Sequence, residues 1–397
     1  MNLTRLAFNN IKGKAFRSFV VAACALLLAA FALSTTLIMR GSETSLRLAL
    51  ERLGADIVVV PTSAVAKVET ALLMGIPSEV WMPRSNLDKV KAVAGVQQLS
   101  PQLYLSTLKD AACCSVANMF LVVYDPATDF TLQPWLKEKL GTGLKQGEVV
   151  GGNYIFTPEG SENILLYGYF VTLKANLEPT GTGLDQTMFF TEETARDISR
   201  ISQSRAVTPL NIPSDSISAI MVKVAPGIDP HAVAVQIAKD IPDVTPIESP
   251  NLFKSYRQQM TGMLGTLVAI LVITWLLSVV LIGLVFSMAA YERRRELGVL
   301  RALGATRNFI LRSLLTEAGL LALGGGLAGG LLVAIGLYVS RKAIVDNLGI
   351  TFVFPDVPGL LLQIALGLGL ALISVTLAAL LPAYRISHED PAVAMRE

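Results

Sequence analysis

Two adjacent cysteines, Cys113 and Cys114, are the side chains in this sequence best suited to ligand or redox chemistry. The third cysteine, Cys24, lies inside an apolar run and cannot reach them. Adjacent cysteines can bridge each other only through a small, strained ring. The open interpretations are packed or intermolecularly bridged cysteines, two free thiols, a vicinal disulfide, or a soft-metal or haem-iron ligand pair. Cys113 and Cys114 are therefore candidate metal ligands, and a purely structural role for them also remains open.

Other catalytic chemistry has little support in the residues. His231 and His388 are the only histidines, and no Ser/His/Asp set, His-Glu-x-x-His motif or paired-cysteine zinc spacing occurs. The sequence also lacks Gly-x-x-x-x-Gly-Lys-Ser/Thr, the loop that binds nucleotide phosphates in many ATPases. We predict that the chain is not an enzyme and binds no cofactor directly. If ATP drives it, the ATPase is expected to be another chain.

An arginine-rich segment, YERRRELGVLRALGATRNFILRSLLTEAG at 291–319, lies between two long uncharged runs. Attraction of basic residues to anionic lipid is worth about 1 kcal/mol each, which accounts for the arginines. It does not account for the apolar, glycine-containing remainder, which favours a short helix that docks on a protein partner. Nucleic-acid binding is not predicted, because these basic residues face lipid or that partner. The predicted docking residues are Glu296, Leu297, Gly298, Leu300, Arg301 and Gly304.

Membrane-spanning helices are the elements that must position this segment. The chain has 397 residues, of which 52% are hydrophobic, and a mean hydropathy of +0.54, which is typical of membrane proteins. A spanning helix needs about 20 apolar residues. Four runs meet that length, at 18–39, 262–290, 318–340 and 357–384. The second run would extend about 44 Å as a helix, against a hydrocarbon core of about 30 Å, so we expect it to protrude outward or to tilt.

Basic residues near the helix ends predict the orientation. The first 17 residues carry four basic residues and no acidic one, and they place apolar residues at helical spacing, as in a helix that lies in the inner headgroup layer. The arginine-rich segment is the other basic cluster. We therefore expect both termini and this segment in the cytoplasm, and residues 43–258 outside the membrane.

The long middle segment predicts an α+β domain. An apolar strand at 55–61, a short helix at 85–95 and a strand after it form one β-α-β unit. The same order recurs from 217 to 248, where Asp229 and Pro230 begin the helix. Two such units predict a ferredoxin-like lobe. The residues between them, 109–216, predict an inserted β-rich lobe.

Four glycines in the third run indicate close helix packing. Gly325, Gly326, Gly329 and Gly330 form two pairs at a spacing that lets helices approach closely. The neighbour could belong to the same chain or to a second copy. Glu317, at the head of this run, could pair with an arginine or cap the helix.

The arrangement of these elements resembles the FtsX-like permease family, which includes MacB-type and lipoprotein-releasing transporters. The resemblance rests on LGADIVVVP, ERRRELGVLRALGAT, Glu317 and LPAYRISHEDPAVAMRE, and follows the chain in order. It implies a permease subunit of an ABC transporter in a bacterial cytoplasmic (inner) membrane. Such a subunit works with a separate cytoplasmic ATPase, as a homodimer or a heterodimer with a related permease, and passes ATP-driven motion to an outer domain.

Two functions remain open at this point. The first is a transporter that exports or extracts a lipophilic or peptide-like substrate, a lipoprotein, haem or a metal. The second is a signalling or scaffold protein that regulates an envelope enzyme, and the large outer domain favours transport over it. The predicted order is interfacial helix 1–17, span 18–39, outer domain 40–258 (β-α-β lobe 55–108 and 217–248, inserted lobe 109–216), span 259–290, cytoplasmic coupling segment 291–313, span 314–340, outer loop 341–356, span 357–384 and cytoplasmic tail 385–397.

Overall fold

The computed structural model describes residues 11, 15–76, 79–105, 119–157, 161–206, 209–302, 304–348 and 351–388. The chain divides into two compact units. The helical unit comprises Met1–Arg40, Gln259–Arg341 and Phe354–Glu397, and the α/β unit comprises Gly41–Gln258 and Lys342–Val353. The α/β unit therefore contains the long middle segment and also residues from the connection between the last two long helices.

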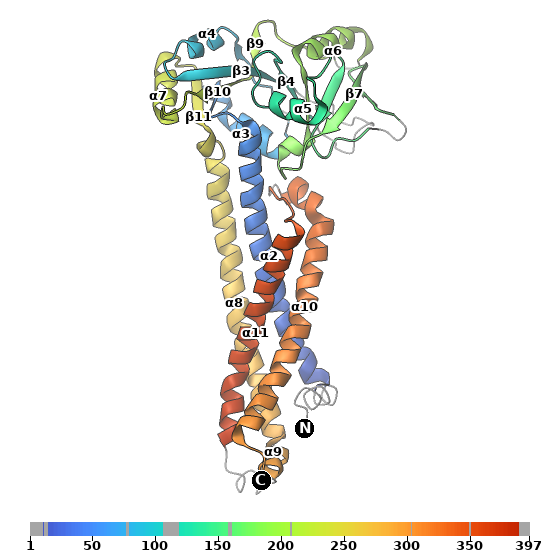
Figure 1. The fold of residues 1–397 in the computed structure, drawn as a ribbon, viewed down its shortest axis with the longest axis vertical. Helices are drawn as coiled ribbons and strands as arrows, with labels where there is room; N and C mark the ends of the chain where they lie inside the picture. The colour runs from blue at the N-terminus through green and yellow to red at the C-terminus, as the bar shows by residue number, and fades with distance from the viewer. Residues whose placement is uncertain are drawn as a thin grey trace. The chain divides into compact units, whose positions relative to one another are not determined.

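Within the described residues, four long helices each contain an apolar stretch that could cross a membrane (Figure 1). They are α2 (Ala15–Leu53), α8 (Lys254–Glu292), α10 (Arg307–Leu348) and α11 (Val357–His388). The prediction of a four-helix membrane protein with an additional α/β domain is confirmed. Helices α2 and α8 have 39 residues each, which corresponds to about 58 Å at the helical rise and exceeds the hydrocarbon core. The predicted interfacial helix falls mostly outside the described residues.

Small and aliphatic side chains fill the space where the four helices meet. Ala25 of α2, Ile282 of α8, Ala322 of α10 and Val375 of α11 are fully buried in one cluster. Helix α8 is the least covered, because only 11% of its apolar window is buried, against 50% for α2. Most of the α8 surface is therefore apolar and turned outward, as expected for a helix in lipid.

A nine-stranded mixed sheet forms the centre of the α/β unit as described (Figure 1). Its order is β11-β1-β10-β3-β4-β8-β5-β7-β6. The strands are β1 (Ile57–Pro61), β3 (Val96–Leu105), β4 (Phe120–Tyr124), β5 (Glu148–Gly151), β6 (Asn163–Leu166), β7 (Tyr169–Asn176), β8 (Thr187–Thr191), β10 (Ala219–Val224) and β11 (Val244–Glu248), while β2 (Met82–Pro83) pairs with β9 (Ser216–Ile217). Five helices accompany the strands: α3 (Val65–Met74), α4 (Asn86–Lys91), α5 (Gln133–Leu140), α6 (Glu192–Arg205) and α7 (Pro230–Asp240).

The first four strands of that order form the β-α-β lobe. Their pairings, β11 with β1, β1 with β10 and β10 with β3, are all antiparallel. Helices α4 and α7 pack on one face through Val90, Val233 and Ile237. Asp229 begins α7 as expected, because its side chain accepts a hydrogen bond from the His231 backbone N–H at 3.0 Å. This arrangement is the predicted ferredoxin-like lobe.

The inserted segment extends the same sheet and has its own core. Strand β4 pairs antiparallel with β3, which joins the two lobes through a continuous hydrogen-bonded ladder. Beyond it, β4 and β8 are parallel, and so are β5 and β7. Val149, Met188, Phe190 and Ile198 belong to a separate buried cluster under α6. The inserted segment thus has a hydrophobic core of its own, as a separate lobe does. Its strands nevertheless continue the sheet of the first lobe.

Candidate functional site

The arginine-rich segment forms a short helix between two long ones. Helix α8 ends at Glu292, and α9 (Arg294–Ala302) follows it and precedes α10. Gly304 lies in the turn after α9 with φ +97°, a conformation that L residues with side chains rarely adopt. The segment therefore consists of the nine-residue helix α9 followed by a turn that depends on Gly304.

The predicted docking residues differ in how much of them is accessible. Glu296 and Gly304 are exposed, Arg301 is half-buried and Gly298 is buried within the chain. Val299, which the sequence analysis did not single out, is 45% exposed on the same helix. The side chains of Leu297 and Leu300 lie outside what the structure describes. A docking surface on α9 is therefore best represented by Glu296, Val299 and Gly304, and its role stays a prediction.

Glu317 is the buried centre of an ion-pair group in the helical unit. Its side chain is 1% exposed. One carboxylate oxygen accepts a hydrogen bond from Arg17 of α2, and the other accepts one from Arg293 at 3.2 Å. We call these three residues the Glu317 junction. Of the two roles left open by the sequence, the structure shows the ion pair, and it shows two arginines rather than one.

The Glu317 junction links elements that are far apart in the sequence. Arg17 lies near the start of α2, Arg293 lies between α8 and α9, and Glu317 lies in α10. Removing one partner from a buried ion pair typically costs about 3–5 kcal/mol, because a charge is left without compensation. The junction therefore ties Arg293, which lies between α8 and α9, to α2 and α10. A sequence signal existed, since Glu317 is the only acidic residue between Glu296 and Asp346.

The four predicted packing glycines are buried in α10. A Cβ on Gly325 would overlap the backbone carbonyl of Ala22, and one on Gly329 would overlap that of Leu26, both in α2. Gly326 and Gly330 face Leu368 and Ile364 of α11 instead. The neighbours in this structure thus belong to the same chain, and the importance of the close approach stays a prediction.

In the α/β unit, several chain segments meet a loop at 180–185, which we call the Asp185 loop. The Ser45 hydroxyl of α2 donates a hydrogen bond to the Thr180 carbonyl at 2.5 Å. The Phe352 backbone N–H, from the connection between α10 and α11, donates to the Gly181 carbonyl at 3.1 Å. The loop therefore contacts residues that follow the first span and residues that lie between the last two.

Helix α8 joins the same region through a tyrosine. The Tyr256 hydroxyl accepts a hydrogen bond from the Thr351 backbone N–H at 2.8 Å. The Thr351 hydroxyl also lies 3.2 Å from the Ser42 hydroxyl of α2. Helices α2 and α8 and the α10–α11 connection are consequently connected to one another through short polar contacts within the α/β unit.

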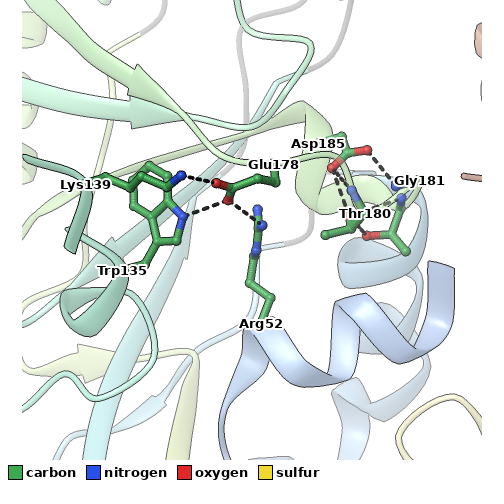
Figure 2. A network of polar contacts seen from close by, with 8 residues as sticks. Arg52, Trp135, Lys139, Glu178, Thr180, Gly181 and Asp185 are labelled. Carbon is green, nitrogen blue, oxygen red and sulfur yellow. Dashed lines mark hydrogen bonds and ion pairs between the residues drawn. The ribbon is translucent and has the colours of Figure 1, made fainter. Parts of the chain in front are cut away.

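Asp185 determines the shape of its loop (Figure 2). One carboxylate oxygen accepts hydrogen bonds from the Thr180 N–H at 2.7 Å and the Thr180 hydroxyl at 2.9 Å, and the other accepts one from the Gly181 N–H at 2.7 Å. Burial raises the pKa of the Asp185 carboxyl, and these hydrogen bonds act in the opposite direction. Burial has the larger effect, so the pKa of Asp185 stays above its ordinary value while the local donors fix the carboxyl group within its loop.

Glu178 gathers three further partners beside this loop (Figure 2). It accepts hydrogen bonds from Trp135 at 2.7 Å and from Arg52 at 3.5 Å, and it lies 2.9 Å from the Lys139 ammonium group. Burial by itself raises the pKa of Glu178, but the hydrogen bonds bring it below its ordinary value. Glu178 therefore connects the last turn of α2 to α5.

The predicted metal or redox site cannot be placed in this structure. Cys113 and Cys114 lie outside the described residues, and Cys24 is a buried free thiol. Among the residues that are described, no group of three or more His, Cys, Asp and Glu side chains could hold a metal ion. A role for the two cysteines stays a prediction.

Comparison with known proteins gives a family match in the C-terminal part of the chain and partial matches to export proteins. Residues 268–391 match the family model of the FtsX-like permease C-terminal domain. The pyoverdine export ATP-binding/permease protein PvdT of Pseudomonas syringae pv. syringae is 33% identical over 133 residues, which are 34% of this chain and 18% of that protein. The macrolide export ATP-binding/permease protein MacB of Marinobacter nauticus is 36% identical over 136 residues, 34% of this chain and 19% of that protein. The chain thus spans less than a fifth of the length of these relatives.

Solved structures also match. The periplasmic region of MacB from Actinobacillus actinomycetemcomitans covers 51% of this chain and 94% of its own length, with a TM-score of 0.32 and 10% identity. The extracellular domain of the noncanonic ABC-type transporter YknZ from Gram-positive bacteria covers 49% and 99%, with a TM-score of 0.28 and 10% identity. The family match at 268–391 includes α9 and Glu317.

Proposed function

We propose that the chain is an FtsX-like permease, because residues 268–391 match the family model of the FtsX-like permease C-terminal domain. The proposed protein is the permease subunit of an ABC transporter in a bacterial inner membrane, and it works with a cytoplasmic ATPase. It transmits ATP-driven movement to the α/β unit outside the membrane, for export or extraction of a substrate. The names of the relatives, which are export ATP-binding/permease proteins, support this class, and we assign no substrate.

The observation that carries the proposal is α9, a short helix between two candidate spans inside the family match. A helix in this position offers the partner a small surface that begins next to the Arg293–Glu317 ion pair and ends at the turn of Gly304. Val299 supplies an exposed apolar side chain and Glu296 an exposed charge. Exposed apolar residues framed by charges are typical of protein-docking surfaces.

The Glu317 junction supplies the next step of the proposed transmission. Because Arg293 directly precedes α9, a displacement of α9 would act on Glu317 and, through it, on Arg17 of α2. Helices α2 and α8 then continue unbroken to Leu53 and from Lys254, respectively, so they also contribute residues to the α/β unit. There the Asp185 loop and Tyr256 provide polar contacts through which such a movement could be received.

The orientation and the assembly are part of the proposal. The basic residues before α2 and around α9 support a cytoplasmic location for both termini and for α9, with the α/β unit on the other side. The large uncovered apolar surface of α8 supports a permease dimer, either with a second copy or with a related permease, because a partner helix would cover part of it.

Substitution on α9 tests the docking role. We expect Val299→Asp in the affinity-tagged full chain to abolish co-purification of an ATPase and the vanadate-sensitive ATP hydrolysis that comes with it. A carboxylate forced into an apolar contact loses several kcal/mol of hydration that the interface does not replace. The readouts are the ATPase band and the hydrolysis rate of the purified sample, relative to the wild-type chain.

Val235→Asp is the matched control for this experiment. Val235 is 55% exposed on α7 of the α/β unit, so it tests an equivalent charge on a helix that the proposal does not assign to the ATPase. The ATPase should co-purify with the Val235→Asp chain in the same amount as with the wild type. Equal recovery with Val299→Asp, or equal loss with both variants, would contradict the docking role of α9.

A further inference from the structure

A basic groove lies in the helical unit where α8, α9 and α11 come together. It has a volume of about 420 Å³ and is lined by Ser287, Tyr291, Arg294, Pro382, Arg385, Ile386 and His388. Two arginines and a histidine contribute to it, and none of the described lining residues is acidic. The groove therefore has the chemistry of an anion site with an apolar wall.

The basic side chains of this groove are arranged by aromatic neighbours. The guanidinium carbon of Arg294 lies 5.8 Å from the centre of the Tyr291 ring, within cation–π range. The His388 ring lies 4.2 Å from that of Tyr384, and its Nδ1 is 3.1 Å from the Tyr384 carbonyl oxygen. The same Nδ1 atom lies 3.1 Å from the Ser387 hydroxyl, so both polar contacts of the ring are made at Nδ1 and the Nε2 side is left for other contacts.

Arg385 is the residue best placed to meet an outside anion. It is exposed, and it makes no ion pair with another side chain in the part of the chain that the structure describes. A guanidinium presents several N–H donors in one plane and binds phosphate oxygens in a bidentate manner. The N–H donors of Arg385 therefore remain available to an outside anion, as far as the described residues show.

The position of the groove indicates the kind of anion. It lies where the apolar stretches of α8 and α11 end, with candidate spans that run to Ala289 and His388. The outward faces of the same two helices are apolar up to this level: Leu284 is 61% exposed, Met288 67% and Leu381 67%. An occupant with a negatively charged head and long apolar chains fits both parts, whereas a free anion uses only the basic part.

We propose that this groove binds the headgroup of an anionic phospholipid, with its phosphate at Arg294 and Arg385 and its acyl chains along α8 and α11. Basic pockets between membrane helices on the cytoplasmic side bind such headgroups through charge, and interfacial tyrosines anchor at the same depth. The site is separate from the Glu317 junction, whose arginines are taken up by an internal carboxylate. It holds the end of α11 and the start of α9 to the same lipid.

Native mass spectrometry of the full chain, purified in detergent and supplied with phosphatidylglycerol, cardiolipin or phosphatidylcholine, tests this proposal. The wild-type chain should retain phosphatidylglycerol and cardiolipin in preference to phosphatidylcholine. Arg294→Ala with Arg385→Ala should weaken that retention roughly ten- to thirtyfold, since each basic residue near anionic lipid contributes about 1 kcal/mol. Arg385→Lys, which keeps the charge, should retain more of it than Arg385→Ala.

Arg341→Ala is the matched control, because Arg341 also lies over a tyrosine, Tyr338, at 4.5 Å, elsewhere on the helical unit. It should bind anionic lipid as the wild type does, and each variant is checked by its elution volume and thermal transition.

Undiminished retention by the double variant, or no preference over phosphatidylcholine, would overturn the proposal. Displacement of the lipid by millimolar inorganic phosphate would assign the groove to a free anion. A gain of lipid only after removal of residues 389–397 would assign it to the chain's own tail; either result overturns the lipid assignment.

Discussion

Glu317 and Asp185 are both buried carboxylates, but they are compensated in different ways. Glu317, in the helical unit, is held by two guanidinium groups, one from α2 and one from Arg293 between α8 and α9. Asp185, in the α/β unit, is held by backbone and hydroxyl donors that lie within five residues of it. The first arrangement joins distant elements and the second shapes one loop. Loss of Glu317 should therefore loosen the packing of helices, whereas loss of Asp185 should act locally.

The largest effect is expected at Glu317. Glu317→Gln leaves Arg17 and Arg293 buried without a countercharge, and we expect it to lower the free energy of unfolding by about 3–5 kcal/mol. The measurement is thermal unfolding of the full chain in detergent. Glu193→Gln, at an exposed position on α6, is the control and should change little. A Glu317→Gln transition that coincides with that of the control would show that the junction does not hold the helices.

A smaller effect is expected from glycine substitution eight residues further along α10. Gly325→Ala places a methyl group against the Ala22 carbonyl and should destabilise by about 1–3 kcal/mol, as overpacking does. Gly324→Ala is the neighbouring control, because no atom lies within 4 Å of its Cβ and alanine favours a helix. Unfolding midpoints that move in the same direction for both variants would mean that close approach to α2 is not required. Comparison of these two glycine variants therefore measures the effect of close packing in α10, independently of the charge of Glu317.

The role of Asp185 is tested by the pH dependence of stability in the wild type and in Asp185→Asn. Because burial raises the pKa of Asp185 above its unfolded value, folded protein binds this proton more tightly than unfolded protein. The stabilising contribution is then fully present below the unfolded pKa of about 3.9 and is lost as the pH rises through the folded pKa. Relative to Asp185→Asn, the wild type should therefore gain stability as the pH falls from neutral toward 4. A pH-independent difference in unfolding midpoint would argue against a raised pKa.

The smallest effect concerns an exposed pair in the β-α-β lobe, between α7 and β11. The Nδ1 atom of His231 lies 2.8 Å from a carboxylate oxygen of Glu248, and this hydrogen bond and charge raise the pKa of His231 above 6.5. Any stability from the pair is thus present below the unfolded pKa of histidine and is lost as the pH rises through the folded value. In a His388→Gln background, the remaining histidine signal in an NMR titration should shift to lower pKa when Glu248→Gln is added. An unchanged titration would refute the pairing in solution.

The sequence was sufficient for features that depend on local composition. Uncharged runs of about 20 residues predicted the four helices, because an apolar stretch of that length has few other stable environments. Asp229 and Pro230 predicted the start of α7 for a similar reason, since capping depends on adjacent residues. The repeated β-α-β order also predicted the ferredoxin-like lobe, which β11, β1, β10 and β3 form.

Other features needed the tertiary structure, because they depend on which distant residues meet. The sequence marked Glu317 as an isolated acid but left its role open, and only the packing of α2 against α10 brings Arg17 to it. Gly298 and Val299 are neighbours in one short helix, yet only the fold buries the first and exposes the second. Likewise, Ser45 and Phe352 converge on the Asp185 loop from positions about 300 residues apart. Local sequence determined the helices, strands and caps by short-range physics, whereas pairwise charge and close packing were decided by the three-dimensional arrangement.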